Sequence, residues 1–176
     1  RAANVFGHVV RWREAGGDPG SIVPFRWDIF ARCGDPAHAD ADKRGDVRGD
    51  AYGSPDGLWF DPRGLLWIQT DVSTSTLNKG DYANLGNNMM LAADVATGET
   101  RRFLVGPAGC EVTGVVMTPD LTTMFVDIQH PGESPSERAD PDRPKATSSW
   151  PDGPSGGRPR SATIVVRRRD GGIVGS

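Results

Sequence analysis

The chain alternates short apolar runs with turn-forming residues, and this pattern limits it to short extended segments. The clearest unit covers 57–68, where two apolar runs flank the sequence Asp61-Pro62-Arg63-Gly64. Proline at the second and glycine at the fourth of these positions are typical of a type I turn. Long helices are disfavoured, because 23 glycines and 14 prolines are spread along the chain. The sequence therefore predicts an all-β fold.

Further strands are predicted on both sides of this hairpin. The apolar runs that indicate them lie at 6–12, 25–30, 89–95, 100–105 and 162–169, with a last short one at 173–174. The stretches 32–50 and 131–161 are rich in turn-forming and charged residues, so we expect irregular loops there. The hairpin and the two strands that follow it make four antiparallel strands in sequence, which is the unit of a β-propeller blade.

The same unit then begins again. Residues 113–120 align with residues 56–63 at an offset of 57 positions, which places Gly114 on Gly57 and Pro119 on Pro62. Repeats of about 40–50 residues are typical of propeller blades, and long loops account for the excess. The prediction is a β-propeller fragment of about two four-stranded antiparallel blades plus part of a third. Residues 1–176 would form the C-terminal part of a single propeller domain.

Composition excludes several classes of function. The formal net charge is −3, with acidic and basic residues interspersed, which does not indicate a nucleic-acid partner. No apolar stretch approaches the roughly 20 residues that span a bilayer. Two cysteines, Cys33 and Cys110, could pair or stay free. Because the chain opens at Arg1 without an initiator methionine or a signal peptide, we expect it to be a fragment of a longer protein.

Acidic residues flank the predicted hairpins where a propeller has its channel. Asp56 and Glu111 precede the first strands of the two blades, whereas Asp71 and His130 follow the second strands. These positions share one face of the disc, so the side chains could converge on one channel mouth. Carboxylates in a narrow space repel one another unless a cation compensates, and calcium accepts irregular sets of oxygen ligands. We therefore predict metal ligands at Asp56 and Glu111, with Asp71 and His130 as additional candidates.

Other interpretations remain open for some of these groups. Asp56 lies in a Pro-Asp-Gly sequence, where an aspartate commonly bonds nearby backbone. The interpretation as a metal ligand is favoured more clearly for Glu111, because a carboxylate at the mouth of an apolar strand has few other partners. His38 lies in the Asp-rich loop, and we expect it to be solvated. Asp40, Asp42 and Asp46 lack the glycine and terminal glutamate of an EF-hand, so a solvated loop is expected there too.

The ordered segments resemble consecutive blocks of the PhoX alkaline phosphatase family. The blocks that carry the resemblance are residues 4–12, 25–30, 53–61, 66–71, 110–114 and 125–133, with the ending 170–176. They arrive in the family's order and leave out only the loops at 32–50 and 134–160. The resemblance implies a bacterial β-propeller enzyme that hydrolyses small-molecule phosphomonoesters and supplies phosphate when it is scarce. It also implies export by the twin-arginine route to the periplasm or the extracellular space.

The resemblance further implies a cluster of calcium and ferric iron in the propeller channel, for which Asp56 and Glu111 match acidic positions of the family. We expect a monomer for the full-length protein. The family's Thr-Cys-Glu-Glu block, which supplies a cysteine ligand to iron, is absent here, and Cys110 does not replace it. An isolated fragment with half a metal site and unpaired blade edges is expected to be inactive and to associate.

Two other functions fit some of the same residues. A calcium-dependent propeller lactonase or esterase would share the channel carboxylates but not the ordered blocks. A non-catalytic calcium-binding propeller module would use the acids for structural calcium and the loop at 131–161 for a protein partner. Release of phosphate from a simple aryl phosphate by the full-length protein separates the phosphatase from both.

Overall fold

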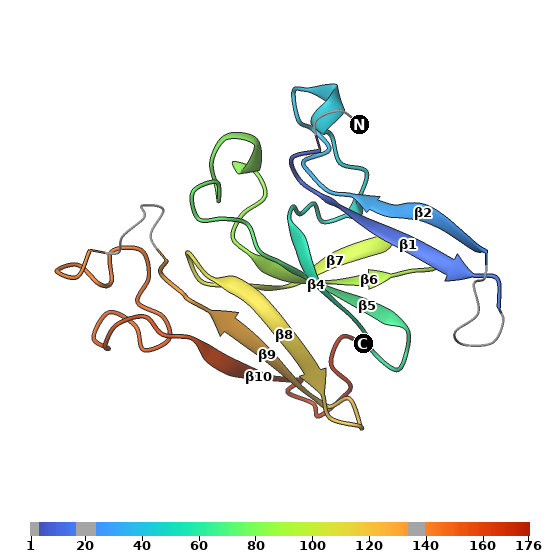
Figure 1. Ribbon diagram of the computed structural model, residues 1–176. Helices are drawn as coiled ribbons and strands as arrows, with labels where there is room; N and C mark the ends of the chain where they lie inside the picture. The colour runs from blue at the N-terminus through green and yellow to red at the C-terminus, as the bar shows by residue number, and fades with distance from the viewer. Residues whose placement is uncertain (1–3, 17–23, 134–139) are drawn as a thin grey trace.

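The computed structural model describes residues 4–16, 24–133 and 140–176, and these form an all-β structure (Figure 1). The strands are β1 (His8–Glu14), β2 (Phe25–Arg32), β3 (Arg48–Gly49), β4 (Pro55–Phe60), β5 (Leu65–Thr70), β6 (Met89–Asp94), β7 (Glu99–Val105), β8 (Glu111–Met117), β9 (Thr123–Gln129) and β10 (Ala162–Arg167). Two short 3₁₀ turns are present, η1 (Ala41–Lys43) and η2 (Gly80–Tyr82). No helix in these three ranges is long and apolar enough to cross a membrane. The predicted fold class is confirmed.

The first blade is a sheet in the order β3-β7-β6-β5-β4. Its four long strands are antiparallel, as the turn signals predicted. The fifth member, β3, pairs in parallel with β7 through Arg48 and Gly49. The four predicted antiparallel strands are thus present, and the loop at 32–50 runs back along the outer edge of the blade and adds two paired residues that were not predicted. The rest of that loop is irregular, as predicted.

The second blade has three strands in the order β10-β9-β8. The segment from Ala162 returns after the long loop to pair with β9, opposite Ile128, as predicted. Residues 173–174 form no strand, which corrects the expectation of a fourth. The Val174 amide instead donates to the Leu121 carbonyl oxygen at 3.0 Å, and its side chain is buried. The segment is therefore held by this hydrogen bond and by packing against the core between the two blades, and it does not pair as a strand.

The internal repeat is visible in the geometry of the two hairpins. Both first strands carry a register shift at the aligned glycine, between Pro55 and Leu58 in β4 and between Thr113 and Val115 in β8. At each site a side chain of the second strand approaches the glycine closely. A Cβ on Gly57 would lie 2.5 Å from the Gln69 side chain, and one on Gly114, where φ is +50°, would lie 2.6 Å from Asp127. The one-residue slip between the copies comes from the second turn, which closes from Thr118 to Thr123 rather than from Asp61 to Leu65.

Two apolar cores lie on opposite sides of the first blade. Leu66, Ile68 and Leu91 face one core, together with Phe6 and Tyr52 from the preceding segments. Trp67 and Met90 face the other core, which they share with Val112, Met124, Val126 and Ile128 of the second blade. Successive strand residues point to opposite faces, so neighbouring positions of β5 serve both cores. Cys33 and Cys110 are buried in different cores and form no disulfide bond with each other, which answers the open question of their pairing.

A buried aspartate organises the turn between β4 and β5. The Asp61 carboxylate accepts hydrogen bonds from the Arg63 guanidinium, the Trp67 indole and the backbone amides of Arg63 and Leu65. Arg63 also donates to the Val174 carbonyl oxygen at 2.9 Å. Burial by itself raises the pKa of Asp61, but these hydrogen bonds outweigh it and hold the pKa below the ordinary value of 3.8. The turn therefore ties the C-terminal segment to the first blade.

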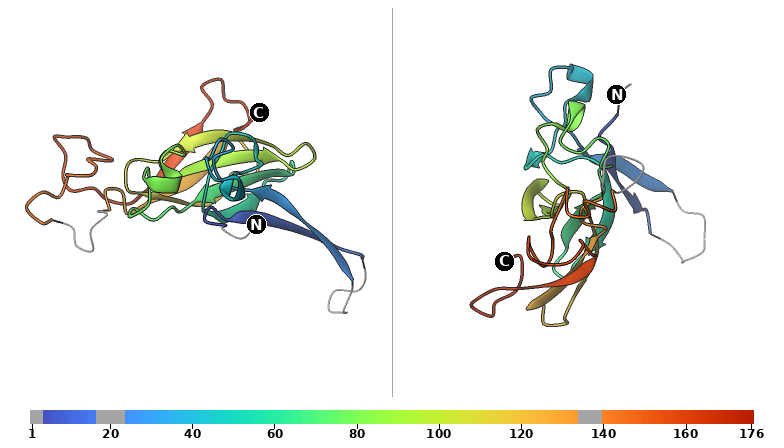
Figure 2. Two further views of the ribbon diagram at one scale, coloured as in Figure 1. Left: turned by 90° about the horizontal axis from the view of Figure 1, so that it is seen from above. Right: turned by 90° about the vertical axis from the view of Figure 1, so that its left-hand side faces the viewer.

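The hairpin of β1 and β2 carries an exposed apolar face and projects beyond the other sheets (Figure 2). The register pairs Val10 with Ile29 and Trp12 with Trp27, and all four side chains lie on one face. Phe25 continues that face towards the hairpin tip. Trp12, Phe25 and Trp27 are 64%, 60% and 63% exposed. A contiguous apolar surface of this kind indicates contact with another protein surface.

The Asp61 network predicts a pH-dependent stability. Because the folded-state pKa is depressed, its contribution is present above the unfolded-state pKa and is lost as the pH falls through the folded-state value. Replacing Asp61 with Asn should lower the free energy of unfolding by about 2–3 kcal/mol at pH 7 and reduce its acid dependence. Urea unfolding monitored by tryptophan fluorescence measures this. Asp120→Asn in the exposed turn of the second hairpin is the control and should cost under about 1 kcal/mol. Equal effects of both changes would contradict the prediction.

The exposed face of the β1–β2 hairpin predicts that the 176-residue chain associates in solution. Sedimentation velocity should show species larger than a monomer at micromolar concentration. The double change Trp12→Asp and Trp27→Asp should shift the distribution to monomer, because it removes the apolar centre of the face. The control changes Arg13 and Arg26, which pair on the opposite face of the same hairpin, to serine. A monomeric parent chain, or an equal shift in the control, would show that this face does not drive association.

Candidate functional site

The predicted site residues lie at the same end of the two hairpins. Asp56 is the second residue of β4, and Asp71 directly follows β5. Glu111 opens β8, and His130 directly follows β9. Pro55 pairs with Thr70, and Glu111 pairs with Gln129, so in each hairpin the start of the first strand meets the end of the second.

Glu111 is the most enclosed of these groups, with 9% of the residue exposed. Gln129 donates its side-chain amide to Oε2 of Glu111 at 2.7 Å. The Nε2 atom of His130 lies 3.5 Å from the same oxygen. The structure thus brings Glu111 and His130 together, and it leaves the other carboxylate oxygen, Oε1, for a further partner among or beyond the described residues.

Asp71 lies near two other acidic side chains, those of Asp56 and Glu133. Burial raises the pKa of its carboxyl, His130 lowers it, and the charges of Asp56 and Glu133 raise it again, with a net pKa above the ordinary value. The structure therefore places Asp56, Asp71 and His130 within electrostatic reach of one another, although they come from different strands. A cation at this end of the blades would relieve the repulsion between the carboxylates.

Sequence reasoning missed Glu133, although it lies only three positions after His130. Its Oε2 atom is 3.7 Å from Nδ1 of His130 and accepts a hydrogen bond from Thr74 at 3.3 Å. The backbone amide of Glu133 donates to the Gly109 carbonyl oxygen at 3.1 Å. The two residues are packed closely, since a Cβ on Gly109 would lie 2.6 Å from the Glu133 carbonyl oxygen. The signal that could have found Glu133 is its place after the second strand, the same rule that selected Asp71 and His130.

Asn88 was also missed, and it joins the two blades beside the acids. The residue is 1% exposed. Its side-chain oxygen accepts from the Thr70 hydroxyl and the Val72 amide, and its side-chain nitrogen donates to the carbonyl oxygens of Val72 and Cys110. These bonds connect the end of β5 with the residue before β8. No sequence pattern singles out one asparagine in a turn-rich stretch.

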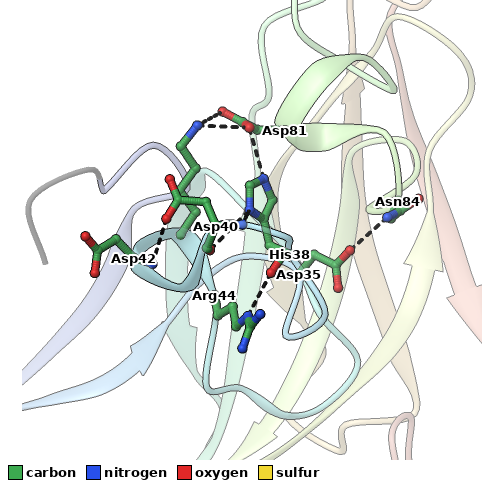
Figure 3. Close-up of polar contacts among 8 residues, drawn as sticks. Asp35, His38, Asp40, Asp42, Arg44, Asp81 and Asn84 are labelled. Carbon is green, nitrogen blue, oxygen red and sulfur yellow. Dashed lines mark hydrogen bonds and ion pairs between the residues drawn. The ribbon is translucent and has the colours of Figure 1, made fainter.

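His38 corrects a prediction, because it is not solvated. Its side chain is 16% exposed, and its Nε2 lies 3.0 Å from Oδ1 of Asp81 in η2 (Figure 3). Lys43 completes the cluster with an ion pair to Asp81 at 2.9 Å. Hydrogen bonds from Lys43 and His38 hold the pKa of Asp81 below its ordinary value. The expectation failed because Asp81 lies 43 positions away from His38, and only the fold brings them together.

The Asp-rich loop around His38 uses its carboxylates for local structure. Asp40 accepts a hydrogen bond from the amide of Asp42 and caps η1. Asp46 binds Arg32 through both the backbone amide and the guanidinium. Asp35 accepts from the Asn84 side chain at 2.8 Å (Figure 3). These contacts fix the loop against the segment between β5 and β6.

The donor chemistry fits a hard cation, although the set is incomplete. Asp56, Asp71, Glu111 and Glu133 present carboxylate oxygens, the ligand type that calcium takes. Within the described ranges, no group of three or more His, Cys, Asp or Glu side chains is arranged to hold a metal ion. Burial raises the pKa of the Cys110 thiol to about 12, with smaller contributions from the charges of Glu111 and Asp71, so without a bound metal the thiol is protonated at neutral pH.

Comparison with known proteins identifies the family of the chain. The family model described as "Alkaline phosphatase PhoX" matches residues 1–132. Among solved structures, Pseudomonas fluorescens PhoX in complex with vanadate, a transition state analogue, is similar to the chain at 46% sequence identity with a TM-score of 0.81. That match covers 97% of this chain and 28% of the other. The comparison with curated proteins gives no match.

The matched structure has a β-propeller fold, in agreement with the two blades described above. The chain spans 28% of the length of that relative, so it accounts for a part of such a propeller. Because the family match covers most of the chain and runs through β1 to β9, the chain belongs to the PhoX family of alkaline phosphatases.

Proposed function

We propose that this chain forms part of an alkaline phosphatase that hydrolyses small-molecule phosphomonoesters and supplies phosphate when it is scarce. The observation that carries the proposal is the gathering of Asp56, Asp71 and Glu111 at one end of two blades in a chain of the PhoX family. We further propose that the full-length protein is a monomer that is exported by the twin-arginine route to the periplasm or the extracellular space. The likeness to the family supports this export.

The residues would serve a cluster of calcium and ferric iron in the propeller channel. Such a cluster supplies positive charge that polarises a phosphoryl oxygen and activates water. Asp56 and Glu111 would hold it through carboxylate oxygens, and Asp71 and His130 are additional ligand candidates. Because Gln129 donates to Glu111 at 2.7 Å, it orients the carboxylate and leaves Oε1 for the metal. Asn88 would keep the two blades at a fixed separation beneath these groups.

Hydrogen bonds from neighbouring residues hold the acids in place against their mutual repulsion. Asp71 has its backbone amide bound to the Ser54 carbonyl oxygen at 3.1 Å, which fixes the end of β5 against the start of β4. Glu133 is held by Thr74 and Gly109. The carboxylates are therefore preorganised on rigid strand ends, as electrostatic stabilisation of a transferring phosphoryl group requires.

Replacing Glu111 with Gln in the full-length protein should reduce phosphatase activity and metal content together. The change keeps the size of the side chain but removes the charge that binds a cation. We expect kcat/KM for 4-nitrophenyl phosphate and bound calcium, measured by mass spectrometry, to fall by at least about 10-fold. Asp56→Asn should act in the same direction. A calcium chelator should abolish the activity of the wild-type protein.

Asp94→Asn is the matched control, since Asp94 ends β6 and its carboxylate accepts hydrogen bonds from the turn residues Ala96 and Thr97. It should leave activity and calcium unchanged. Calcium binding without turnover in the wild-type protein would favour a non-catalytic calcium-binding propeller, and hydrolysis of lactones or carboxylic esters instead would favour a lactonase or esterase. Full activity and full metal content in Glu111→Gln would exclude Glu111 as a ligand.

The 176-residue chain by itself should be inactive. It corresponds to 28% of the matched relative, and its described acids do not complete a metal site. Incubation of the purified chain with calcium, ferric iron and 4-nitrophenyl phosphate tests this, with the full-length protein as the positive control. Metal-dependent turnover by the isolated chain, removed by Glu111→Gln, would show that these two blades are sufficient.

A further inference from the structure

A pocket of about 580 Å³ opens beside the acidic residues. Its wall is made by the residue before β4 and by the segment between β5 and β6, which is green in Figure 1. The described residues that line it are Val5, Ser54, Val72, Ser73, Ser75, Thr76, Lys79, Gly80, Asp81 and Tyr82. The volume lies in the range of sites for small molecules, about 300–1,000 Å³.

The pocket adjoins the proposed metal ligands. Val72 and Ser73 directly follow Asp71 in the chain, and Ser54 precedes Asp56 by two positions. The hydrogen bond from the Asp71 amide to the Ser54 carbonyl oxygen joins these two sides of the wall. Consecutive Cα atoms are about 3.8 Å apart, so the lining residues Ser54, Val72 and Ser73 lie within a few ångströms of the backbone of Asp56 or Asp71. The pocket is therefore within reach of a molecule whose phosphoryl group is held at the acids.

The lining is rich in hydroxyl groups. Ser73 and Ser75 bond to each other at 2.9 Å, and Ser75 also lies 3.5 Å from the Thr76 hydroxyl. Hydroxyl groups both donate and accept, so they match the hydroxyls of a polyol better than they match an apolar ring. The apolar contribution to the described lining is limited to Val5, Val72 and the ring of Tyr82.

One positively charged side chain in the pocket wall, that of Lys79, has no ion-pair partner among the described residues. Asp81 also lines the pocket, and its carboxylate is already paired with Lys43 and His38 (Figure 3). Lys79, the cationic residue among the described lining, has no ion pair within the part of the chain that the structure describes. An anionic group on a bound molecule would provide its partner.

The wall is built before any ligand arrives. The Tyr82 hydroxyl donates to the Val5 carbonyl oxygen at 2.8 Å and lies 2.8 Å from the Ser54 hydroxyl. Tyr82, Leu77 and Leu85 are buried in the apolar core beneath the segment. The pocket therefore requires little ordering when it binds a molecule.

We propose that this pocket binds the alcohol portion of the phosphomonoester, and that it selects a polyol that carries a second anionic group, such as a sugar bisphosphate. Hydroxyls of Ser73, Ser75 and Thr76 would bond the polyol, and Lys79 would pair with the distal anion. The inference rests on the proposed phosphatase function, because it assigns the part of the substrate that is not transferred.

The test uses the full-length protein with two substrates. Glucose 1,6-bisphosphate carries a distal anion, whereas 4-nitrophenyl phosphate does not. Lys79→Gln should raise KM for the bisphosphate about 5-fold, as expected for the loss of one charge contact at a partly exposed site, and should leave kcat and KM for 4-nitrophenyl phosphate unchanged. Arg101→Gln removes an exposed cation from β7, on a different edge of the blade, and should change neither substrate.

The outcomes separate this inference from the phosphatase function. Hydrolysis of both substrates with an equal KM change in Lys79→Gln, or with none, would overturn the assigned pocket and leave the phosphatase intact. If the wild-type protein hydrolyses neither substrate, calorimetry of bisphosphate binding decides. About 5-fold weaker binding in Lys79→Gln, with binding by Arg101→Gln unchanged, would support the assigned pocket but not the phosphatase function. Equal binding by all three proteins would reject the assigned pocket.

Discussion

The side-chain amide of Asn88 forms hydrogen bonds that hold the two blades together where the acids gather. Asn88 accepts from Thr70 and Val72 and donates to Val72 and Cys110, and it is almost fully buried. A buried amide can be satisfied only if the end of β5 and the start of β8 keep their separation, because unpaired polar groups in the interior are costly. The positions of Asp71 and Glu111 follow from that constraint, since each lies next to a residue that Asn88 binds.

The opposite end of the blades is held by a charged network rather than by an amide. Asp61 binds its own turn, Arg63 and Trp67, and Arg63 reaches the Val174 carbonyl oxygen. Between the two ends, Trp67 and Met90 pack against the apolar residues of the second blade. With both ends tied and the centre close-packed, the blades behave as one rigid support. A support of this kind allows like charges to be held close together until a cation compensates them.

The segment between β5 and β6 forms a wall of the pocket and is held firmly against the scaffold. It is anchored from below by Leu77, Tyr82 and Leu85 and from the side by the contacts of Asp81 with His38 and Lys43. Its exposed side carries the hydroxyls and Lys79. One segment thus supplies both core residues and a polar wall, which is the arrangement expected where a loop on a rigid sheet carries binding residues.

Local sequence patterns predicted the hairpins, the repeat and every strand except β3, and they placed Asp56, Asp71, Glu111 and His130 at the same end of the two hairpins. They also predicted a strand at 173–174 that does not form. These features are local: apolar alternation and turn chemistry act within a few residues, and the end of a strand on which a residue lies follows from its place in a hairpin. The register shifts at Gly57 and Gly114 follow the aligned glycines for the same reason.

The tertiary structure alone decided the contacts between distant segments. These contacts are the parallel pairing of β3 with β7, the burial of Val174, the His38–Asp81 pair and the hydrogen bonds of Asn88. Their side-chain hydrogen bonds span from 16 positions, between Asn88 and Val72, to 111 positions, between Arg63 and Val174. Nothing in the local pattern marks these residues, because the same residue types serve in solvated loops. Their partners are specified by how two packed sheets bring the loops together, and this packing is a property of the whole fold.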